Sequence, residues 1–362
     1  AVSDIEGMNL LRRNGALLIG QTMSDREIVF GGQRVDLETV IAGWQNKLGK
    51  VFPTDVKNKP EIDNRLTENT YLKNYSAIKN KSEIKTSAPY VMNSSKARPK
   101  VFIPVFPGTN CEYDTQKAFE NAGASTDILV VRNLTHQAIT ETIAVMERRI
   151  AKAQIIMLPG GFSGGDEPEG SGKFIAAALR NPALTEQIRI LLQKRDGLML
   201  GICNGFQALV KLGLLPYGDI TDLTSDSPTL TFNSIGRHVS TYVTTRVVSN
   251  RSPWLALTKQ DELYQIPVSH GEGRFTASPE ILSKLIEADQ VATQYVDLNG
   301  RPSIETAYNP NGSVAAIEGI ISADGRIFGK MGHSERYGTD IAKNIPGNKD
   351  QHLFEAGVKW FE

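Results

Sequence analysis

The pattern of apolar and polar positions predicts an α/β chain over its central part. Helical spacing of apolar residues predicts helices at 112–122, around 143–150, at 173–180 and at 184–194. Between them stand four continuous apolar runs, typical of strands buried on both faces: 101–106, 128–131, 155–158 and 197–202. This alternation indicates a three-layer fold, in which helices cover both faces of a mostly parallel sheet. Right-handed crossovers would bring the carboxyl ends of all these strands to one edge, where ligands bind.

The C-terminal third of the chain adds a pattern of antiparallel strands. Residues 239–248 alternate partly between apolar and polar. Residues 313–321 and 326–331 flank Ser322-Ala323-Asp324-Gly325, and Asp-Gly between apolar runs is a strong hairpin signal. The second arm of this hairpin ends at Gly332-His333-Ser334-Glu335, so we expect a histidine just beyond the end of a strand.

The N-terminal part has a different character. Residues 15–20 and 27–31 resemble strands and 36–44 predicts a helix, which is too little to form a core of its own. We therefore expect residues 1–53 to be the end of a folded domain, beginning at an internal position of a longer protein. Residues 54–97 are polar with little periodicity and predict a linker.

Composition narrows the class of protein. The 362 residues include 40 basic and 40 acidic side chains, and this balance argues against a general nucleic-acid or anionic-membrane surface. Only two cysteines occur, Cys111 and Cys203, so we expect no disulfide framework and a reducing, cytoplasmic location. No apolar run approaches the roughly 20 residues that span a bilayer.

Cys203 is the candidate nucleophile. It follows the apolar run 197–202, and the spacing Gly201-x-Cys203-x-Gly205 is the cysteine counterpart of the G-x-S-x-G nucleophile elbow. A thiol in that turn lies at a helix N-terminus, where the helix dipole favours the thiolate. The alternative is an ordinary buried core cysteine, which the two flanking glycines argue against.

A thiol nucleophile needs a base, and His333 is the preferred histidine. Glu335 lies two residues later, so its carboxylate can share a face with the imidazole and fix its tautomer. Cys203, His333 and Glu335 would then be the nucleophile, base and orienting carboxylate of an acyl-transfer enzyme. His270, in the segment Ser269-His270-Gly271, is the competing base.

The same chemistry requires donors for an oxyanion. The glycine-rich segment 159–166 follows the strand at 155–158, and its backbone N–H groups can form an anion-binding nest. We assign the oxyanion hole to the N–H of Gly161, or alternatively Phe162, together with the N–H of Asn204. A phosphate or dinucleotide loop is the alternative, but the segment lacks the G-x-G-x-x-G order.

Several segments together resemble the triad-type class I glutamine amidotransferases. The resemblance rests on 159–163 (Pro-Gly-Gly-Phe-Ser), 201–207 (Gly-Ile-Cys-Asn-Gly-Phe-Gln) and 333–335 (His-Ser-Glu). It narrows to the glutaminase domain of phosphoribosylformylglycinamidine synthase through 107–112 (Pro-Gly-Thr-Asn-Cys-Glu), 267–275 (Pro-Val-Ser-His-Gly-Glu-Gly-Arg-Phe) and 332–337 (Gly-His-Ser-Glu-Arg-Tyr). In many relatives the histidine motif reads Pro-His-Pro-Glu, and here Gly332 and Ser334 replace both prolines, which predicts a less rigid turn.

The resemblance covers 98–362 and implies a flavodoxin-like glutamine amidotransferase fold. It also implies that residues 1–53 are the tail of the ATP-dependent synthetase domain, so that the chain comes from the long single-chain form of the enzyme. This domain would hydrolyse glutamine to glutamate and ammonia, which the synthetase part uses to convert formylglycinamide ribonucleotide to formylglycinamidine ribonucleotide. ATP and Mg would be bound by the synthetase part, and this chain would bind no metal.

By the same resemblance, five residues contact the substrate glutamine: Phe162, Gln207, Ser269, His270 and Gly271. Cys111 matches a motif position, but with no base near it in sequence we expect it to be structural. Two alternatives stay open, a stand-alone hydrolase of γ-glutamyl amides and a catalytically silent module that docks on the synthetase. The synthetase-like tail argues against the first, and the complete set of Cys203, His333 and Glu335 against the second.

Overall fold

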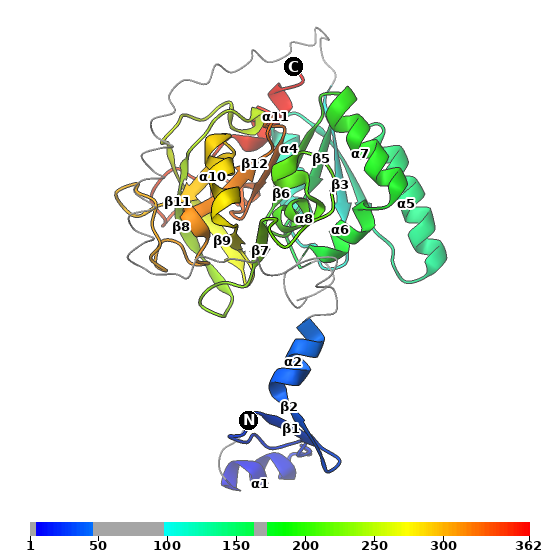
Figure 1. Cartoon of the computed structure of the whole chain (residues 1–362), viewed down its shortest axis with the longest axis vertical. Coiled ribbons are helices and arrows are strands. Elements are labelled where there is room, and N and C mark those ends of the chain that lie inside the picture. Colours follow the sequence, from blue (N-terminus) through cyan, green and yellow to red (C-terminus); the bar gives the residue numbers. More distant parts are fainter. Residues whose placement is uncertain (1–4, 46–97, 163–171) are drawn as a thin grey trace. The chain divides into compact units, whose positions relative to one another are not determined.

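The computed structural model describes residues 5–45, 98–162 and 172–362, which form two separate units. The predicted linker at 54–97 lies outside the described residues, as does most of the glycine-rich segment after Phe162. In the described part of the chain, no helix is long and apolar enough to cross a membrane. Figure 1 shows the elements of both units along the chain.

The N-terminal unit consists of two helices and a hairpin: α1 (Ile5–Arg13), β1 (Glu27–Phe30), β2 (Gln33–Asp36) and α2 (Leu37–Gln45). The predicted strand at 15–20 was wrong, because residues 16–20 have no regular structure and Ile19 is fully exposed. Among the described residues, β1 and β2 pair only with each other. Residues 16–20 therefore have no neighbouring strand with which to pair. Helix α1 has no buried residue, as expected for a piece without a core of its own.

The second unit is built on one nine-stranded sheet with the order β4-β3-β5-β6-β13-β12-β11-β8-β9. Five neighbouring strands run parallel: β3 (Lys100–Val105), β4 (Ser125–Val130), β5 (Ile155–Leu158), β6 (Leu198–Ile202) and β13 (Ile327–Lys330). Four antiparallel strands extend the same sheet: β8 (Val239–Val247), β9 (Leu263–His270), β11 (Val291–Tyr295) and β12 (Ile317–Ile321). The predicted α/β fold and the predicted β12–β13 hairpin are confirmed.

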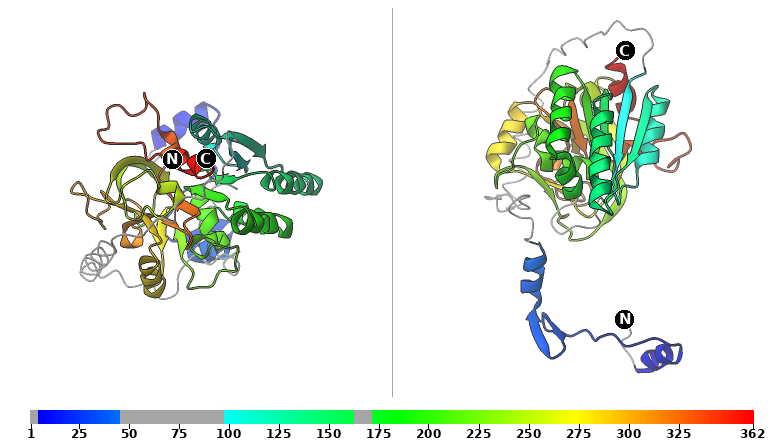
Figure 2. Two further views of the ribbon diagram at one scale, coloured as in Figure 1. Left: turned by 90° about the horizontal axis from the view of Figure 1, so that it is seen from above. Right: turned by 90° about the vertical axis from the view of Figure 1, so that its right-hand side faces the viewer.

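Helices cover both faces of the parallel half of the sheet. They are α4 (Glu112–Asn121), α5 (His136–Ile150), α6 (Lys173–Leu179), α7 (Pro182–Lys194), α8 (Asn204–Leu212), the short α9 (Leu214–Tyr217) and α11 (Leu353–Lys359). The β3–α4–β4 and β4–α5–β5 crossovers run in opposite directions along the sheet, so their common handedness puts α4 and α5 on opposite faces. Helix α11 joins α4 through an edge-to-face contact of Phe119 and Phe354, and α5 packs beside α7 (Figures 1 and 2).

The remaining elements lie in the C-terminal half: β7 (Thr229–Thr231), β10 (Arg274–Thr276), α10 (Pro279–Glu287) and the single-turn helices η2 (Pro253–Leu255), η3 (Val314–Ala316) and η4 (Ser334–Arg336). Strand β12 starts at Ile317, four residues later than predicted, because η3 occupies the apolar residues before it. The parallel strands β3, β5, β6 and β13 all end at the same edge of the sheet. That edge therefore collects the loops that carry the predicted site.

Candidate active site

Cys203 lies in a strained turn between β6 and α8. It is the N-cap of α8, with φ 53° and ψ −105°, a backbone conformation that non-glycine residues rarely adopt. The flanking glycines are required by close packing, since a Cβ on Gly205 would come 1.9 Å from the carbonyl oxygen of Leu158. A Cβ on Gly201 would come 2.7 Å from the carbonyl group of Gly205. The spacing of the two glycines thus reflects an elbow that leaves no room for side chains.

A Gly205→Ala variant is expected to unfold more easily and to lose activity together with stability. The added methyl must push α8 away from β5, and overpacking of this kind costs about 1 to 3 kcal/mol. Denaturant unfolding measures the change, with Gly43→Ala as the control, because a Cβ on Gly43 meets nothing within 4 Å. Equal stability of the two variants would contradict the packing argument.

His333 and Glu335 form a buried pair next to the elbow. Strand β13 is parallel to β6, with Lys330 opposite Ile202, so the residues after both strands emerge side by side. His333 Nδ1 lies 2.5 Å from Glu335 Oε1, and His333 N donates to Pro267 O at 2.9 Å. Within the described residues, His333 Nε2 is buried without a hydrogen-bond partner. The carboxylate therefore occupies one ring nitrogen and leaves the other for chemistry.

The electrostatics of this pair favour its charged form. Burial alone would lower the pKa of His333, but the charge of the Glu335 carboxylate, together with the interactions of the imidazolium with the sulfur atoms of Cys203 and Cys111, holds that pKa well above its ordinary value. Burial would raise the pKa of Glu335, and the charge and hydrogen bond of His333 lower it instead. An imidazolium stabilised in this way can give a proton to a leaving group.

Cys111 lies closer to the base than its place in the sequence suggested. Its Sγ is 3.8 Å from His333 Nδ1 and 3.1 Å from the Arg336 guanidinium, which donates to it. Cys111 was expected to be structural because no base lies near it in the sequence. In the folded structure a base, His333, does lie near it. Cys111 faces the ring nitrogen that Glu335 already occupies, whereas Cys203 lies in the strained elbow. The geometry therefore favours Cys203 as the nucleophile.

Ligand atoms of Cys111, His333 and Glu335 lie within 4.8 Å of one another, a grouping that invites comparison with a metal site. Tetrahedral zinc with bonds of about 2.0 to 2.1 Å keeps its nitrogen and oxygen ligands about 3.3 Å apart. The 2.5 Å between Nδ1 and Oε1 is a hydrogen bond, and Arg336 brings a positive charge to the sulfur. These three residues fit a hydrogen-bonded cluster better than a metal centre.

His270, the competing base, lies in the same region but has no carboxylate partner among the described residues. Burial and the positive charges of His333 and His238 lower the pKa of His270 to about 3, so its imidazole is neutral at neutral pH. Its Nδ1 lies 3.2 Å from Asn233 Oδ1, and Asn233 Nδ2 donates to the His270 carbonyl at 2.8 Å. No motif or periodicity in the sequence pointed to Asn233 as the residue that holds this loop.

The two candidate oxyanion donors near the end of β5 differ in availability. Phe162 N donates to Gly108 O at 2.8 Å, so it is already engaged. No carbonyl or side chain in the described ranges accepts from the N–H of Gly161, whose φ is 144°. The neighbouring Gly160 touches the base, since a Cβ there would come 2.6 Å from His333 Cε1. This geometry favours Gly161 over Phe162.

One of the predicted substrate-contacting residues, Ser269, lies against the thiol, and others contact its neighbours. Ser269 O lies 3.7 Å from Cys203 Sγ, and Ser269 Oγ lies 3.1 Å from His238 Nε2. The Phe162 ring lies 6.1 Å from that of His238. Gly271 continues the Ser269 loop, and its carbonyl accepts from Asn233 N. The end of β9 therefore lies against Cys203, and His238 links it to Phe162 after β5.

Gln207 joins α8 to the loop after β9. Its amide nitrogen donates to Glu272 O, and its Oε1 accepts from Asn204 Nδ2 at 3.2 Å. Because both ends of this buried amide are engaged, Gln207 holds the loop in place in this structure. A direct contact of Gln207 with glutamine stays a prediction.

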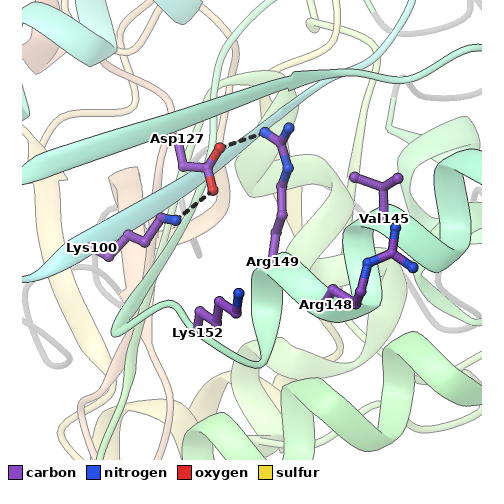
Figure 3. Close-up of a pocket in the computed structure, with 6 residues that line it drawn as sticks. All are labelled: Lys100, Asp127, Val145, Arg148, Arg149 and Lys152. Carbon is purple, nitrogen blue, oxygen red and sulfur yellow. Dashed lines mark hydrogen bonds and ion pairs between the residues drawn. The ribbon is translucent and has the colours of Figure 1, made fainter.

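A separate cavity of about 450 Å³ lies at the opposite edge of the sheet, where β3 begins (Figure 3). Asp127 bridges two cations there, Lys100 at 2.9 Å and Arg149. The other lining residues are Val145, Arg148 and Lys152. This basic hollow is remote from the carboxyl ends of the strands and takes no part in the site around Cys203.

Comparison with known proteins places this arrangement in a family. Residues 98–361 match the CobB/CobQ-like glutamine amidotransferase domain. The chain is 38% identical over 238 residues to phosphoribosylformylglycinamidine synthase subunit PurQ of Dehalococcoides mccartyi, which spans 66% of this chain and 85% of that protein. It is 34% identical over 248 residues to the same subunit of Aquifex aeolicus, spanning 68% of this chain and 95% of that one.

A solved structure agrees with these relatives. PurLQS from Thermotoga maritima superimposes with a TM-score of 0.51 and 25% identity, covering 73% of this chain and 99% of that one. The chain therefore belongs to the CobB/CobQ-like glutamine amidotransferases, and among them to the glutaminase components of phosphoribosylformylglycinamidine synthase.

Proposed function

We propose that the chain hydrolyses glutamine through a thioester on Cys203 and passes the ammonia to the synthetase part of phosphoribosylformylglycinamidine synthase, in purine biosynthesis. The observation that carries this proposal is the strained N-cap position of Cys203 beside the buried His333–Glu335 pair. The elbow presents the sulfur at the N-terminal end of α8, toward which the helix dipole is positive. The adjacent imidazolium supplies the proton that ammonia needs.

In the first half of the reaction, the Cys203 thiolate attacks the amide carbon of glutamine and the carbonyl oxygen becomes an oxyanion. The N–H groups of Gly161 and Asn204 are the proposed donors to this oxygen. His333 then protonates the amide nitrogen, the carbon–nitrogen bond breaks, and ammonia leaves an acyl thioester behind.

In the second half, neutral His333 takes a proton from water, which attacks the thioester. The carbon–sulfur bond breaks, releasing glutamate and restoring the thiolate and imidazolium. Glu335 keeps the imidazole in the required tautomer throughout. Phe162, Gln207 and residues 269–271 form the wall against which the amino-acid end of glutamine would bind.

The partner in this proposal is the synthetase part of the same enzyme. We infer that residues 1–53 are its C-terminal tail, so that the chain belongs to the long single-chain form, although the relatives compared above are separate subunits. The exposed apolar side chains of the N-terminal unit, such as Leu17 and Phe30, support packing against a larger body. ATP and Mg act in the synthetase part, in the cytoplasm, and glutamine hydrolysis on this chain requires neither.

Labelling with a chloroketone analogue of glutamine tests the proposal. The analogue is expected to alkylate Cys203 and not Cys111, to be slowed by added glutamine, and to abolish glutamine-dependent synthesis by the complete enzyme. Mass spectrometry of the digested protein identifies the modified cysteine.

Other outcomes of this experiment would favour the alternatives. Labelling without any effect on synthesis would favour a stand-alone amide hydrolase. No protection by glutamine, together with no hydrolysis in the complete enzyme, would favour a silent docking module.

A further inference from the structure

Two charged residues are fully buried directly beneath the His333 turn. Lys330, the last residue of β13, and Glu318, in β12, both have completely inaccessible side chains, and Lys330 Nζ lies 3.7 Å from Glu318 Oε1. A buried ion pair costs much desolvation energy and is often replaceable by apolar residues without loss of stability. Its presence in the middle of a sheet therefore calls for a role besides stability.

Both charges make hydrogen bonds to the residues on either side of His333. Glu318 Oε1 accepts from the N–H of Gly332 at 2.6 Å. Lys330 Nζ donates to Ser334 Oγ at 2.7 Å. Both ends of the turn that carries the base are thus bound to the ion pair.

The network is closed by residues from two other elements. Gln351 Oε1 accepts from Lys330 Nζ at 2.5 Å and from Ser334 Oγ at 2.6 Å. Thr293 Oγ1, in β11, donates to the second oxygen of Glu318. These bonds leave neither charged group of the pair without hydrogen-bond partners.

Lys330 also reaches the nucleophile through its backbone. Its carbonyl accepts from Cys203 N at 2.8 Å, while its ammonium holds Ser334 one residue beyond the base. One residue therefore binds both the elbow that carries the thiol and the turn that carries the imidazole.

Gly332 and Ser334 are the residues that make these bonds. A proline at position 332 would have no N–H to give Glu318. A Cβ there would also come 2.6 Å from Ile266 Cγ2 and 2.9 Å from Glu318 Oε1. A proline at 334 would offer Lys330 no hydroxyl. The turn is thus held by side-chain hydrogen bonds that prolines at these positions could not make.

We propose that Glu318 and Lys330 are positioning residues, whose ion pair fixes the His333–Glu335 turn against the Cys203 elbow. This inference rests on the proposed glutaminase function. A base displaced by about 1 Å can cost about 10²-fold in rate, so we expect loss of the pair to reduce kcat for glutamine hydrolysis about 10- to 100-fold. KM for glutamine should stay the same, because the side-chain hydrogen bonds of Glu318 and Lys330 within the described residues go to Thr293, Gly332, Ser334 and Gln351 and not to residues 269–271.

The decisive variant is the complete enzyme with Glu318→Leu and Lys330→Met. The two substitutions remove both charges together and fill the same space with apolar side chains of similar volume. We expect this variant to remain folded at the assay temperature with a lowered unfolding temperature, because the Gly332 N–H and the Thr293 hydroxyl lose their acceptor. Glutamine-dependent kcat and the rate of Cys203 alkylation by the chloroketone analogue should fall together. Ammonia-dependent synthesis should be unaffected. The Glu318→Gln, Lys330→Met variant, which keeps an acceptor for Gly332 N–H, should recover part of the loss.

A matched control is the ion pair of Arg246 and Asp261, 2.6 Å apart in the antiparallel half, whose arginine side chain is 3% exposed. Arg246→Met with Asp261→Asn should leave kcat and alkylation unchanged. If the apolar double variant is too unstable to assay, Ser334→Ala, which removes only the hydroxyl, must show the same loss of kcat without a change in KM.

A kcat like that of the control in a folded Glu318–Lys330 variant, or in Ser334→Ala, would overturn the positioning role. That result is distinct from failure of the proposed function, which would appear as glutamine hydrolysis by Cys203→Ala.

Discussion

A Cys203→Ala variant of the complete enzyme is expected to lose glutamine-dependent synthesis by at least about 10⁴-fold, because the proposed nucleophile that forms the thioester is removed. Synthesis from added ammonium salt should continue at the normal rate, since ammonia bypasses the thiol. The methyl of alanine fits the space of the buried thiol, so the fold should be retained. The measurement is to assay glutamine-dependent and ammonia-dependent synthesis on one preparation of the variant.

Cys111→Ala is the matched variant for this experiment, because Cys111 is the second free cysteine and also contacts His333. It is expected to keep most of the glutamine-dependent rate. If Cys111→Ala abolished glutamine hydrolysis in a folded enzyme, while Cys203→Ala retained it, the assignment of nucleophile would have to be reversed.

A Glu335→Gln variant is expected to lose about 10⁴-fold in glutamine-dependent kcat, as when an orienting carboxylate is replaced by its amide in a catalytic triad. The amide can donate to His333 Nδ1, which puts the ring proton on Nε2 and leaves no acceptor on the thiol side. Removing the carboxylate charge also lowers the pKa of His333, which Glu335 now holds above its ordinary value. The alkaline limb of the residual pH–rate profile should therefore move to lower pH.

The control is Glu355→Gln at the protein surface. Glu355 makes a similar contact with a histidine, 3.0 Å from His352 Nδ1, but both side chains are exposed. Its pH–rate profile should match that of the unmodified enzyme. An unchanged alkaline limb in Glu335→Gln would show that the carboxylate does not set the protonation of the base.

The parallel half of the fold could be predicted from the sequence because its strands are buried on both faces. Continuous apolar runs such as 155–158 leave few alternatives, and β5 has all four residues buried. The antiparallel half was predicted less completely. Strand β9 has a burial pattern that alternates along Leu263–His270. This segment carried the period-two signal of a strand, but it was used only as a family motif and no strand was predicted there. Residues 15–20 failed for the opposite reason, since an apolar run forms a strand only where another strand can pair with it.

For the candidate site, the sequence could predict that Cys203, His333 and Glu335 lie close together, because they follow strands that end at the same edge. It could not place Cys111 beside His333, which lies 222 positions away, because that contact depends on how β3 and β13 share one sheet. Glu318 and Lys330 are visible in the sequence as isolated charges within apolar strands. The sequence does not show which backbone groups they bind, because that depends on the register of β12 against β13.

The position of β13 has a consequence for the order in which the protein is made. Strand β6 and its thiol leave the ribosome long before β13, although the two strands are neighbours in the finished sheet. Pairing of such distant segments comes late in folding, because the intervening chain must first be ordered. A nascent chain therefore carries the nucleophile before its base has been added. We expect it to hydrolyse no glutamine until the β12–β13 hairpin has been synthesised and has joined the sheet.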